Sequence, residues 1–499
     1  MRLMTNINLG SDTVRKLALG ACLAAIVATI SCNTFLDPKP KDILAPENFY
    51  KSSNDAVAAV NGVYESNKWN HWLGYWYMTD VASDDINASA NFGSDGHRMA
   101  EYSFDATEGT VDGPWSGGYG LINRANAVLD RVPDITMDET LKARLLGEAK
   151  YLRATAYFDL VRFYGDVPLI EHEVKSLSGL DVARTPAADV YTLIISDLQA
   201  AVTSLPASYS GPDLGRATSG AAKTLLAKVY LTRADWANAA ATTGAIITSA
   251  QYHLNPVWKD NFRIATELVN PESIFEVNYD AELDPGGGAI MNLFSLPEGF
   301  PGGDAYGLMF LTPSLVSSYA ANDQRGNHGT FMISPYTDAL SRTTTWSVPQ
   351  GAAFDKYLDE TNDQNMNSRS WVQQNNNWVI SRFADVLLMH AEAVNEGGAA
   401  GPMSATVALD SVRHRAGLAS TTAVGQAALR DAIRLERRKE FVFEGIRWFD
   451  LARWNILDAA LRAKQTEMGY TVRGARSNLF PIPQQELDIN KSLTQNPGW

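Results

Sequence analysis

The chain has 499 residues, of which 45% are hydrophobic and 20% are charged, and its formal net charge is −14 at pH 7. This balance is typical of a globular protein with a large core, and the acidity argues against nucleic acid or an anionic membrane surface as a partner held by charge. The composition therefore favours a neutral ligand or a specific protein partner. The only cysteines are Cys22 and Cys32, so no disulfide framework is expected and stability must come from the core.

Residues 1–31 have the pattern of a secretory signal peptide. Basic residues precede the apolar run Leu17–Ile30, which is about as long as the hydrophobic region of a signal and short for a membrane span. The small Ser31 directly before Cys32 predicts cleavage at Cys32 and diacylation of its thiol, which would anchor the chain by lipid without a transmembrane helix. Thr29 stands where such signals usually carry leucine, so an ordinary secretory signal stays open as the alternative.

Residues 32–53 are expected to form an extended tether, because prolines punctuate them and proline-rich linkers act as spacers. An amphipathic helix is predicted for Asn54–Tyr64, where Asn54 is a suitable N-cap. Residues 67–114 are irregular and rich in aromatic, Gly, Asn and Asp residues, which is the composition of a functional loop region. Helical periodicity returns at Trp115–Arg131, Glu139–Tyr164 and Asp189–Ser204.

An internal repeat lies within the helical part of the chain. Gly147–Phe158 reads GEAKYLRATAYF and Gly220–Leu231 reads GAAKTLLAKVYL, at an offset of 73 residues. That offset is close to two tetratricopeptide-type units of about 34 residues, although two Ala- and Leu-rich helices can also look alike by chance. With two later helix pairs, the pattern predicts about four helix–turn–helix units, interrupted by a loop-rich insert at residues 251–378. The later pairs join Ser381–Glu396 to Ser404–Ala416 and Ala427–Phe443 to Trp448–Lys464.

Distinctive motifs follow one another from the lipidation cysteine to the last residue. They are Cys32 with Phe35-Leu36-Asp37, Trp115 with Tyr119 and Ala125-Asn126, Tyr151-Leu152-Arg153-Ala154, Tyr164-Gly165-Asp166-Val167-Pro168-Leu169, Gly215-Arg216-Ala217-Thr218, Arg382 with Ala384-Asp385-Val386-Leu387-Leu388, Val412-Arg413 with Arg415-Ala416-Gly417, Glu436-Arg437-Arg438, Glu444-Gly445, Arg447-Trp448, Asp450-Leu451, Pro481-Ile482-Pro483 and Gln495-Asn496-Pro497-Gly498-Trp499. In this order, they make the chain resemble the SusD/RagB family of outer-membrane nutrient-binding lipoproteins over essentially its whole mature length.

The resemblance implies a mainly α, SusD-like fold with about four tetratricopeptide-type helix pairs and a large loop-rich insert. It also implies a protein without catalytic activity or cofactor, lipid-anchored to the outer membrane of a Gram-negative bacterium and facing outward. Its role would be to capture oligosaccharide for a SusC-like TonB-dependent transporter. Peptide in place of glycan is the alternative, and a glycan-degrading enzyme is the outside alternative. The implied organisation is an N-terminal helical region at 54–250 and a C-terminal region at 251–499, divided into the insert at 251–378, helices at 379–464 and a tail at 465–499.

The segment Glu436–Arg453 carries the charges most like those of an active site. Glu436, Glu440 and Glu444 recur at steps of four, and paired carboxylates can act as acid and base on a glycosidic bond. Arginines alternate with these carboxylates, however, so the favoured interpretation is an ion-pair network that holds the last helices together.

Metal signals in the sequence are incomplete. The histidines show no ligand spacing. Carboxylates at positions 280, 282 and 284 are spaced as in a calcium loop, but Pro285 and Met291 stand where that loop needs Gly and Glu. No metal site is therefore predicted.

Aromatic residues of the N-terminal loop region are the candidates for ligand contact. A pyranose has an apolar C–H face and a rim of hydroxyls, so flat rings can cover the face while Asn, Asp and Arg side chains bind the hydroxyls. Trp72 and Trp76 are four residues apart, and the stripe of a buried helix explains them equally well. The Gly/Asn/Ser context of Asn91, Phe92 and Arg98 favours a loop and ligand contact. The remaining candidates are Tyr75 and Asp84 in this region and Phe300, Tyr306, Trp346 and Trp371 in the insert, where the family resemblance places further contacts.

Overall fold

The structure is a computed structural model that describes residues 49–71, 73–89, 91–176, 181–279, 291–346, 351–368 and 375–499. The chain divides into two units, Met1–Lys51 and Ser52–Trp499, and the second contains the helices and strands described below. The predicted signal peptide, tether and Cys32 lie outside the described residues, apart from the last residues of the tether, and so do Trp72, Trp371 and the acidic run at 280–284. No helix within the described ranges is long and apolar enough to span a membrane.

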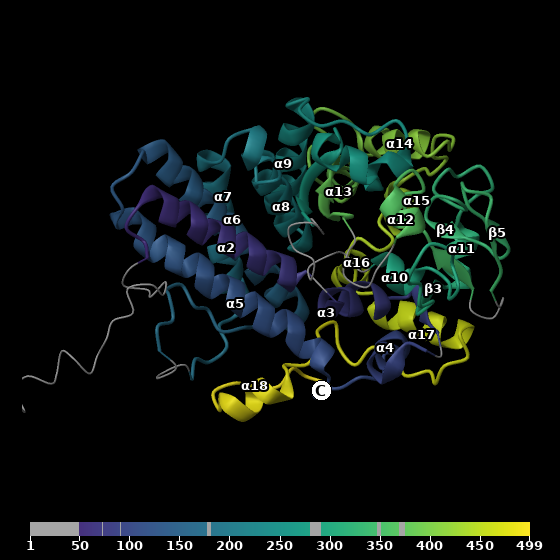
Figure 1. Ribbon diagram of the computed structural model, residues 1–499, viewed down its shortest axis with the longest axis horizontal. Helices are drawn as coiled ribbons and strands as arrows, with labels where there is room; N and C mark the ends of the chain where they lie inside the picture. The colour runs from purple at the N-terminus through teal and green to yellow at the C-terminus, as the bar shows by residue number, and fades with distance from the viewer. Residues whose placement is uncertain are drawn as a thin grey trace, which may run out of the picture. The chain divides into compact units, whose positions relative to one another are not determined.

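Long helices build the N-terminal part of the second unit and lie side by side in Figure 1. All the helices predicted for this part are present, but the prediction that residues 67–114 are irregular was wrong, because α2 continues to Asn70, α3, η1 and α4 follow, and α5 begins at Gly109. Local caps set two of the starts: Asp138 accepts a hydrogen bond from the Leu141 N–H at 2.8 Å, and Thr218 accepts one from the Ala221 N–H at 3.1 Å. The helices are α2 (Ser53–Asn70), α3 (Leu73–Trp76), the π-helix η1 (Tyr77–Val81), α4 (Gly93–Glu101), α5 (Gly109–Arg131), α6 (Glu139–Tyr164), α7 (Ala187–Ser204), α8 (Ser219–Thr232) and α9 (Trp236–Thr248).

Two glycines explain how the helix pairs approach each other. Helix α6 packs on α7, and α8 packs on α9. A Cβ at Gly147 would collide with Ser204 at the end of α7, and a Cβ at Gly220 would collide with Tyr252 just beyond α9. Both glycines open a copy of the sequence repeat, so each copy brings its first residue against a side chain at the end of the following helix or a few residues beyond it. This shared contact is what a repeated helix-pair unit requires.

The C-terminal helices continue the packing. Helix α13 lies against α9 and α14, over a core cluster that includes Ala227, Ala240, Met389 and Ala393. Small side chains at this contact let the helices come close without leaving voids. The helices of this part are α13 (Phe383–Asn395), α14 (Ala405–Arg415), α15 (Gln426–Glu440), α16 (Arg447–Arg453), α17 (Leu457–Glu467) and α18 (Gln484–Ile489).

Two predicted helix boundaries in this part were wrong. The helix predicted to reach Phe443 ends at Glu440, because Phe443 has a φ of 60° and the buried Lys356 ammonium binds the freed carbonyl of Glu440 at 3.1 Å. The helix predicted for Trp448–Lys464 is two helices, α16 and α17, and Asn455 between them has a φ of 56°. Left-handed residues end a helix in a way that hydrophobic periodicity does not reveal.

The insert contains small sheets as well as loops. Strands β1 (Ile86–Ala88), β3 (Met309–Leu311), β7 (Ala352–Phe354) and β4 (Phe331–Met332) form an antiparallel sheet in the order β1-β3-β7-β4, with Asn87 opposite Phe310. This sheet joins the N-terminal loop region to the insert. The other elements of the insert and its borders are β2 (Ser273–Val277) paired with β8 (Trp378–Arg382), β5 (Tyr336–Thr337) paired with β6 (Thr343–Thr344), the short helices α10 (Met291–Ser295), α11 (Pro313–Ser318) and α12 (Asp363–Asn367), and 3₁₀ turns at Trp258–Phe262 and Ile264–Val269.

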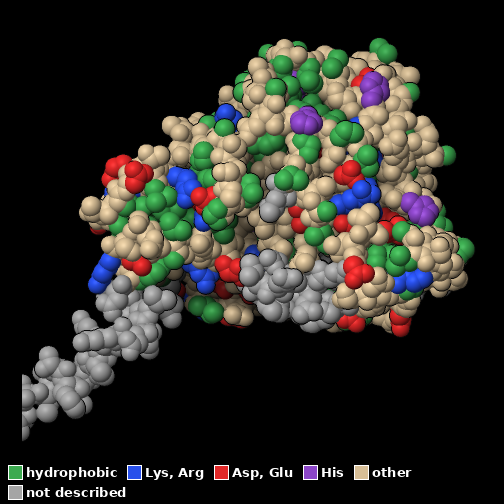
Figure 2. All heavy atoms as spheres, turned by 45° about the horizontal axis from the view of Figure 1, so that its top comes forward, with side chains coloured by type: hydrophobic (Ala, Val, Ile, Leu, Met, Phe, Trp, Pro, Cys, Tyr) green, Lys and Arg blue, Asp and Glu red, His purple; other side chains and the backbone are tan. Residues whose placement is uncertain are grey.

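Charges of both signs are interspersed on the face that Figure 2 shows, without a large patch of one sign. A mixed surface of this kind does not attract a polyanion by long-range field. On this face, the structure agrees with the expectation from composition that charge alone does not select the partner.

Candidate functional site

The segment that most resembled an active site is the centre of a buried ion-pair network. Glu440 is fully buried and accepts from Arg325 at 2.8 Å, from Arg382 at 2.5 Å and from Arg415. Burial alone would raise the pKa of Glu440, but the charges of the three arginines outweigh it and hold that pKa well below its usual range. A carboxylate so enclosed stays ionised and cannot reach a substrate. The ion-pair interpretation of this segment is confirmed.

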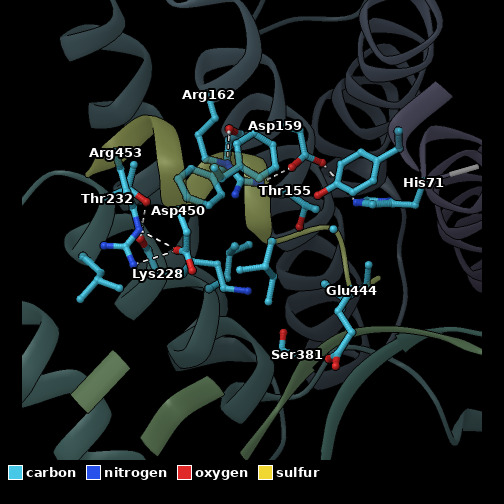
Figure 3. Close-up of a pocket in the computed structure, with 18 of the residues that line it drawn as sticks. His71, Thr155, Asp159, Arg162, Lys228, Thr232, Ser381, Glu444, Asp450 and Arg453 are labelled. Carbon is cyan, nitrogen blue, oxygen red and sulfur yellow. Dashed lines mark hydrogen bonds and ion pairs between the residues drawn. The ribbon is translucent and has the colours of Figure 1, made fainter. Parts of the chain in front are cut away.

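An enclosed cavity of about 50 Å³ lies where the N-terminal helices meet the C-terminal ones. Figure 3 shows Asp159 between His71 and Arg162, with Asp450 and Arg453 facing them across the cavity. His71 Nε2 lies 3.2 Å from Asp159 Oδ2, and His71 Nδ1 donates to the Asn67 carbonyl at 3.0 Å. An Asp–His pair occurs in hydrolases, but both ring nitrogens of His71 face oxygen atoms of the protein itself, one on Asp159 and one on the Asn67 backbone, so neither is directed at a substrate. The pair links α2 to α6.

The aromatic residues of α3 belong to the core. Trp76 is 1% exposed and stacks on Trp378 with ring centroids 5.1 Å apart. Tyr75 is also buried, against Phe163 and Phe449. Their rings are covered by protein, because Trp378 of β8 lies on Trp76, and Phe163 of α6 and Phe449 of α16 lie against Tyr75. The prediction that Tyr75 and Trp76 contact ligand is therefore corrected: both are core residues. For Trp76, this outcome is the alternative given above, the stripe of a buried helix.

Two candidates from the insert are also core residues. Phe300 and Trp346 lie in one hydrophobic cluster with Tyr336 and Met366, at 2% and 8% exposure respectively. The indole N–H of Trp346 donates to the Gly351 carbonyl at 3.1 Å, which satisfies its one polar group internally. These rings stabilise the insert, and the prediction that they present a face to ligand is corrected.

Asp84 is another candidate whose carboxylate oxygens are already bound within the protein. Arg447 binds both of its carboxylate oxygens, with Nε at 2.7 Å from Oδ1 and Nη2 at 2.8 Å from Oδ2. Burial would raise the pKa of Asp84, but Arg447 and Arg438 overcome it and hold that pKa far below its usual range. Asp84 therefore anchors a loop to α16, and its assignment to ligand contact is corrected.

What remains of the predicted site gathers where β1 meets β3. The Ser89 N–H donates to the Leu308 carbonyl at 2.8 Å, which continues the pairing of the strands beyond β1. Four rings from both regions follow one another here: the Tyr77–Phe92 centroids are 5.2 Å apart, and the Phe92–Phe294 and Phe294–Tyr306 centroids are each 6.4 Å apart. We call Tyr77, Phe92, Phe294 and Tyr306 the aromatic row. The two predicted regions thus contribute to one surface.

The members of the aromatic row differ in exposure. Phe92 is 6% exposed, which corrects its predicted role as an open stacking face, whereas Tyr306 at the other end is 36% exposed. Burial, and then the charge of Asp95, raises the pKa of Tyr77 to about 12, so its hydroxyl stays protonated at neutral pH and can both donate and accept. Phe294 was not predicted, because only the pairing of β1 with β3 brings it to the row.

Polar side chains lie beside the aromatic row. Asn91 is exposed, next to Phe92. Arg98 on α4 is 46% exposed in its side chain and pairs with Glu108 at 2.6 Å and with Asp95 at 3.2 Å. A guanidinium held by two carboxylates keeps a fixed orientation while its outer edge faces solvent. We take Asn91, Arg98 and Tyr306 as the candidate site, with the buried rings of the aromatic row as the support of Tyr306. Which of the three contact ligand stays a prediction.

Among the residues that the structure describes, no group of three or more His, Cys, Asp or Glu side chains is placed to hold a metal ion. The acidic run at 280–284, which was weighed as a calcium loop, lies outside those residues. The exposed groups of the candidate site are the Tyr306 ring, the Asn91 amide and the paired Arg98 guanidinium.

Comparison with known proteins assigns the chain to a family. Residues 328–499 match the family described as "SusD family", and residues 34–231 match the one described as "Starch-binding associating with outer membrane". A SusD-like protein of Formosa agariphila is 27% identical over 96% of this chain and 98% of its own length. A SusD-like protein of Bacteroides ovatus is 27% identical over 88% of this chain and 82% of its own length. The chain belongs to the SusD/RagB family.

Solved structures agree with this assignment. A laminarin-binding SusD-like protein is 27% identical, with a TM-score of 0.77 over 90% of this chain and 100% of its own. A SusD homologue from Bacteroides thetaiotaomicron is 25% identical, with a TM-score of 0.77 over 91% and 98%. The surface glycan-binding protein A from Bacteroides uniformis is 25% identical, with a TM-score of 0.75 over 90% and 100%. The predicted mainly α, SusD-like fold is confirmed.

Proposed function

We propose that this protein is a lipid-anchored outer-membrane binding protein that captures oligosaccharide and delivers it to a SusC-like TonB-dependent transporter. One observation carries the proposal: a surface of rings and polar groups, built jointly by the N-terminal loop region and the insert, in a chain 27% identical to a laminarin-binding SusD-like protein. Family membership supports the binding role, and the partly exposed ring of Tyr306, at one end of the aromatic row, supports a ligand with an apolar face.

The chemistry of a sugar fits this surface. The partly exposed ring of Tyr306 offers a face to the C–H side of a pyranose, while the Asn91 amide and the outer edge of the Arg98 guanidinium can bind hydroxyls. Because Arg98 is already oriented by Glu108, little side-chain entropy is lost when it binds. Binding of this kind strains no sugar bond, so we expect capture without cleavage.

Peptide capture is the alternative, and glycan cleavage is the outside alternative. A peptide would also use a ring face and an arginine, so the candidate site does not separate the two ligand classes. A glycan-degrading enzyme needs an accessible pair of carboxyl groups flanking the bond. The enclosure of Glu440 by arginines removes the pair for which this alternative was weighed.

The test is a glycan array and a peptide library screened with the mature protein, followed by calorimetric titration with soluble laminarin and with the best array hit. We expect saturable glycan binding and no new reducing ends after prolonged incubation. Arg98→Ala should weaken that binding, whereas its matched control, Arg462→Ala, should not, because Arg462 is 50% exposed and pairs with a nearby helical aspartate in the same way. Peptide binding without glycan binding would replace the proposal by peptide capture. Glycan cleavage by the purified protein would replace it by the outside alternative, a glycan-degrading enzyme.

The anchor is tested separately. In a strain that lacks the transporter, the wild-type protein should fractionate with membranes, and Cys32→Ser should be released or remain as an unprocessed precursor. Unchanged membrane fractionation of Cys32→Ser in that strain would contradict lipidation. This test does not depend on the identity of the ligand.

A further inference from the structure

The turn that leads into β1 is held by arginines from distant parts of the chain. Residues 82–85 connect η1 to β1, and Asp84 and Asp85 within them are buried. Arg447 of α16 binds Asp84 through two hydrogen bonds, and Arg438 of α15 donates to Asp85 Oδ1 at 2.6 Å. Such charge-assisted bonds fix the geometry of both partners. The carboxylates of this turn are thus fastened to the C-terminal helices.

A third cation reaches the backbone of the same turn. Lys464 of α17 is 2% exposed, and its ammonium donates to the Ser83 carbonyl at 2.7 Å and to the Val81 carbonyl at 3.3 Å. Val81 is the last residue of η1, so Lys464 binds a carbonyl that the end of the helix leaves without a partner. A cation at this end also meets the negative pole of the helix dipole.

Lys464 differs from the other buried cations of this junction. In the described parts of the chain, no carboxylate pairs with it directly, whereas Arg438 and Arg447 each bind an aspartate. A lysine buried without a carboxylate is costly, which suggests that its position serves the backbone it holds. Burial lowers the pKa of Lys464 to about 7, against the opposing charges of Asp84, Asp85 and Glu101. Even the neutral amine keeps two N–H groups, so both carbonyls can stay bound on either side of that pKa.

The same stretch of chain holds the far side of the loop region. Gln465, the next residue of α17, donates to the Glu101 carbonyl at the end of α4 at 2.8 Å. Tyr470, just beyond α17, is hydrogen-bonded to Asn87 in β1. Strand β1 precedes Asn91, and helix α4 follows it and carries Arg98. Both elements are thus fastened to α17 and the residues that follow it.

We propose that Lys464 is a positioning residue: by binding the carbonyls of Val81 and Ser83, it sets the path of the 82–85 turn and thereby the placement of the candidate ligand surface at Asn91 and Arg98. It touches no ligand itself. The expected effect of Lys464 on ligand affinity rests on the proposed function. The expected effect of Lys464 on the turn is independent of any ligand.

The experiment compares wild type, Lys464→Met and Arg153→Met in the mature chain. Methionine keeps the apolar stem of lysine and removes its N–H groups. Arg153 on α6 is the control, because it is also a buried cation, at 6% exposure, and is bound to Asp197 on α7, away from the turn. Lys464→Gln is measured in parallel as a milder change that should give a smaller effect. The readouts are hydrogen–deuterium exchange of residues 82–89, the affinity for soluble laminarin, and Tm.

We expect Lys464→Met to speed amide exchange in residues 82–89 by about tenfold or more and to weaken laminarin binding by about fivefold or more. Arg153→Met should lower Tm but leave both the exchange of this segment and the affinity unchanged. Unchanged exchange at residues 82–89 in Lys464→Met would overturn the proposal. Faster exchange with full laminarin affinity would also overturn it, since the turn would then not place the ligand surface. Failure of wild type to bind any glycan, with faster exchange in the variant, would contradict the proposed function but support the role of Lys464 in holding the turn.

Discussion

The junction around Glu440 and the surface around the aromatic row use charge in opposite ways. At the junction, carboxylates and guanidinium groups are buried and paired with one another; Glu440 alone binds three arginines. At the surface, Asn91 and the Arg98 side chain are exposed and Tyr306 is partly exposed. The polar groups of the junction bind one another and stabilise the fold, whereas some polar groups of the surface stay available to a ligand.

This difference shows how to distinguish framework from site among similar residue types. A buried charge without a partner costs several kcal/mol, so buried charges in a stable protein are bound by opposite charges or, like Lys464, by backbone carbonyls, and are then unavailable to a ligand. A charge at the surface loses little by being left partly unpaired. Alternating charges around Glu440 therefore indicated structure, whereas exposed polar side chains such as Asn91 and Arg98 stay available for contact. The following predictions test this division, beginning with the largest expected effect.

Replacing Glu440 by Gln should destabilise the protein most. The change leaves Arg325, Arg382 and Arg415 buried with too little negative charge, which costs about 3–5 kcal/mol. Urea unfolding at pH 7 measures the loss, with the exposed Glu467→Gln as a control that should stay within about 0.5 kcal/mol of wild type. A loss below about 1 kcal/mol for Glu440→Gln would mean that the network does not hold the helices together.

Trp76→Ala should also act on stability. Removing a buried indole that stacks on Trp378 is expected to cost about 3–5 kcal/mol and to lower Tm clearly. Glycan affinity of the folded fraction should match that of wild type. Thermal melts beside calorimetric titrations separate the outcomes, and a variant that melts like wild type but binds more weakly would return Trp76 to the ligand site.

Tyr306→Ala should show the opposite pattern. Because the side chain is 36% exposed, its removal should leave Tm nearly unchanged. Loss of a good ring contact with a sugar is worth on the order of 1–3 kcal/mol, or roughly 5- to 150-fold in affinity. Titration with the best array hit measures the change. Wild-type affinity in both Tyr306→Ala and Arg98→Ala would remove this surface from consideration.

A smaller, pH-dependent effect is expected at Glu267, a carboxyl that no cation pairs with among the described residues. Burial, and then the neighbouring Glu276, raises the pKa of Glu267 from 4.5 to about 9, although the Asn377 N–H donates to it at 2.7 Å. The folded protein therefore binds this proton more tightly than the unfolded chain, and stability falls as pH rises from about 4.5 towards 9. Glu267→Gln cannot ionise and should escape that fall.

Chemical unfolding at pH 5 and at pH 9 tests this expectation. The variant and wild type should be nearly equal at pH 5, and the variant should be more stable at pH 9 by about 1 kcal/mol or more. Glu440→Gln is the contrasting case, since its parent carboxylate is already ionised at both pH values. An equal difference between Glu267→Gln and wild type at both pH values would show that Glu267 is not protonated in the folded protein.

The sequence by itself determined the helical scaffold and the family. Apolar stripes such as that of α6, caps such as Asp138 and the ordered motifs are local or linear signals, and each is readable without knowing what the chain packs against. The ion-pair interpretation of Glu436–Arg453 could also be reached from the sequence, because its carboxylates alternate with arginines, although the segment is not one helix: α15 ends at Glu440 and α16 begins at Arg447. The identity of most ion-pair partners could not be predicted, however, because Arg325 and Arg382 come from outside the segment.

The tertiary structure decided which rings are core and which face solvent. Periodicity shows that Trp76 has neighbours on one face of a helix, but only the position of Trp378 shows that this face is covered. Asp84 looked available until Arg447, from the far end of the chain, was seen to bind both of its oxygens. The joining of the N-terminal loop region to the insert likewise depends on the pairing of β1 with β3. These contacts join residues far apart in sequence, and a side chain's burial depends on what the rest of the chain places over it, which no local pattern contains.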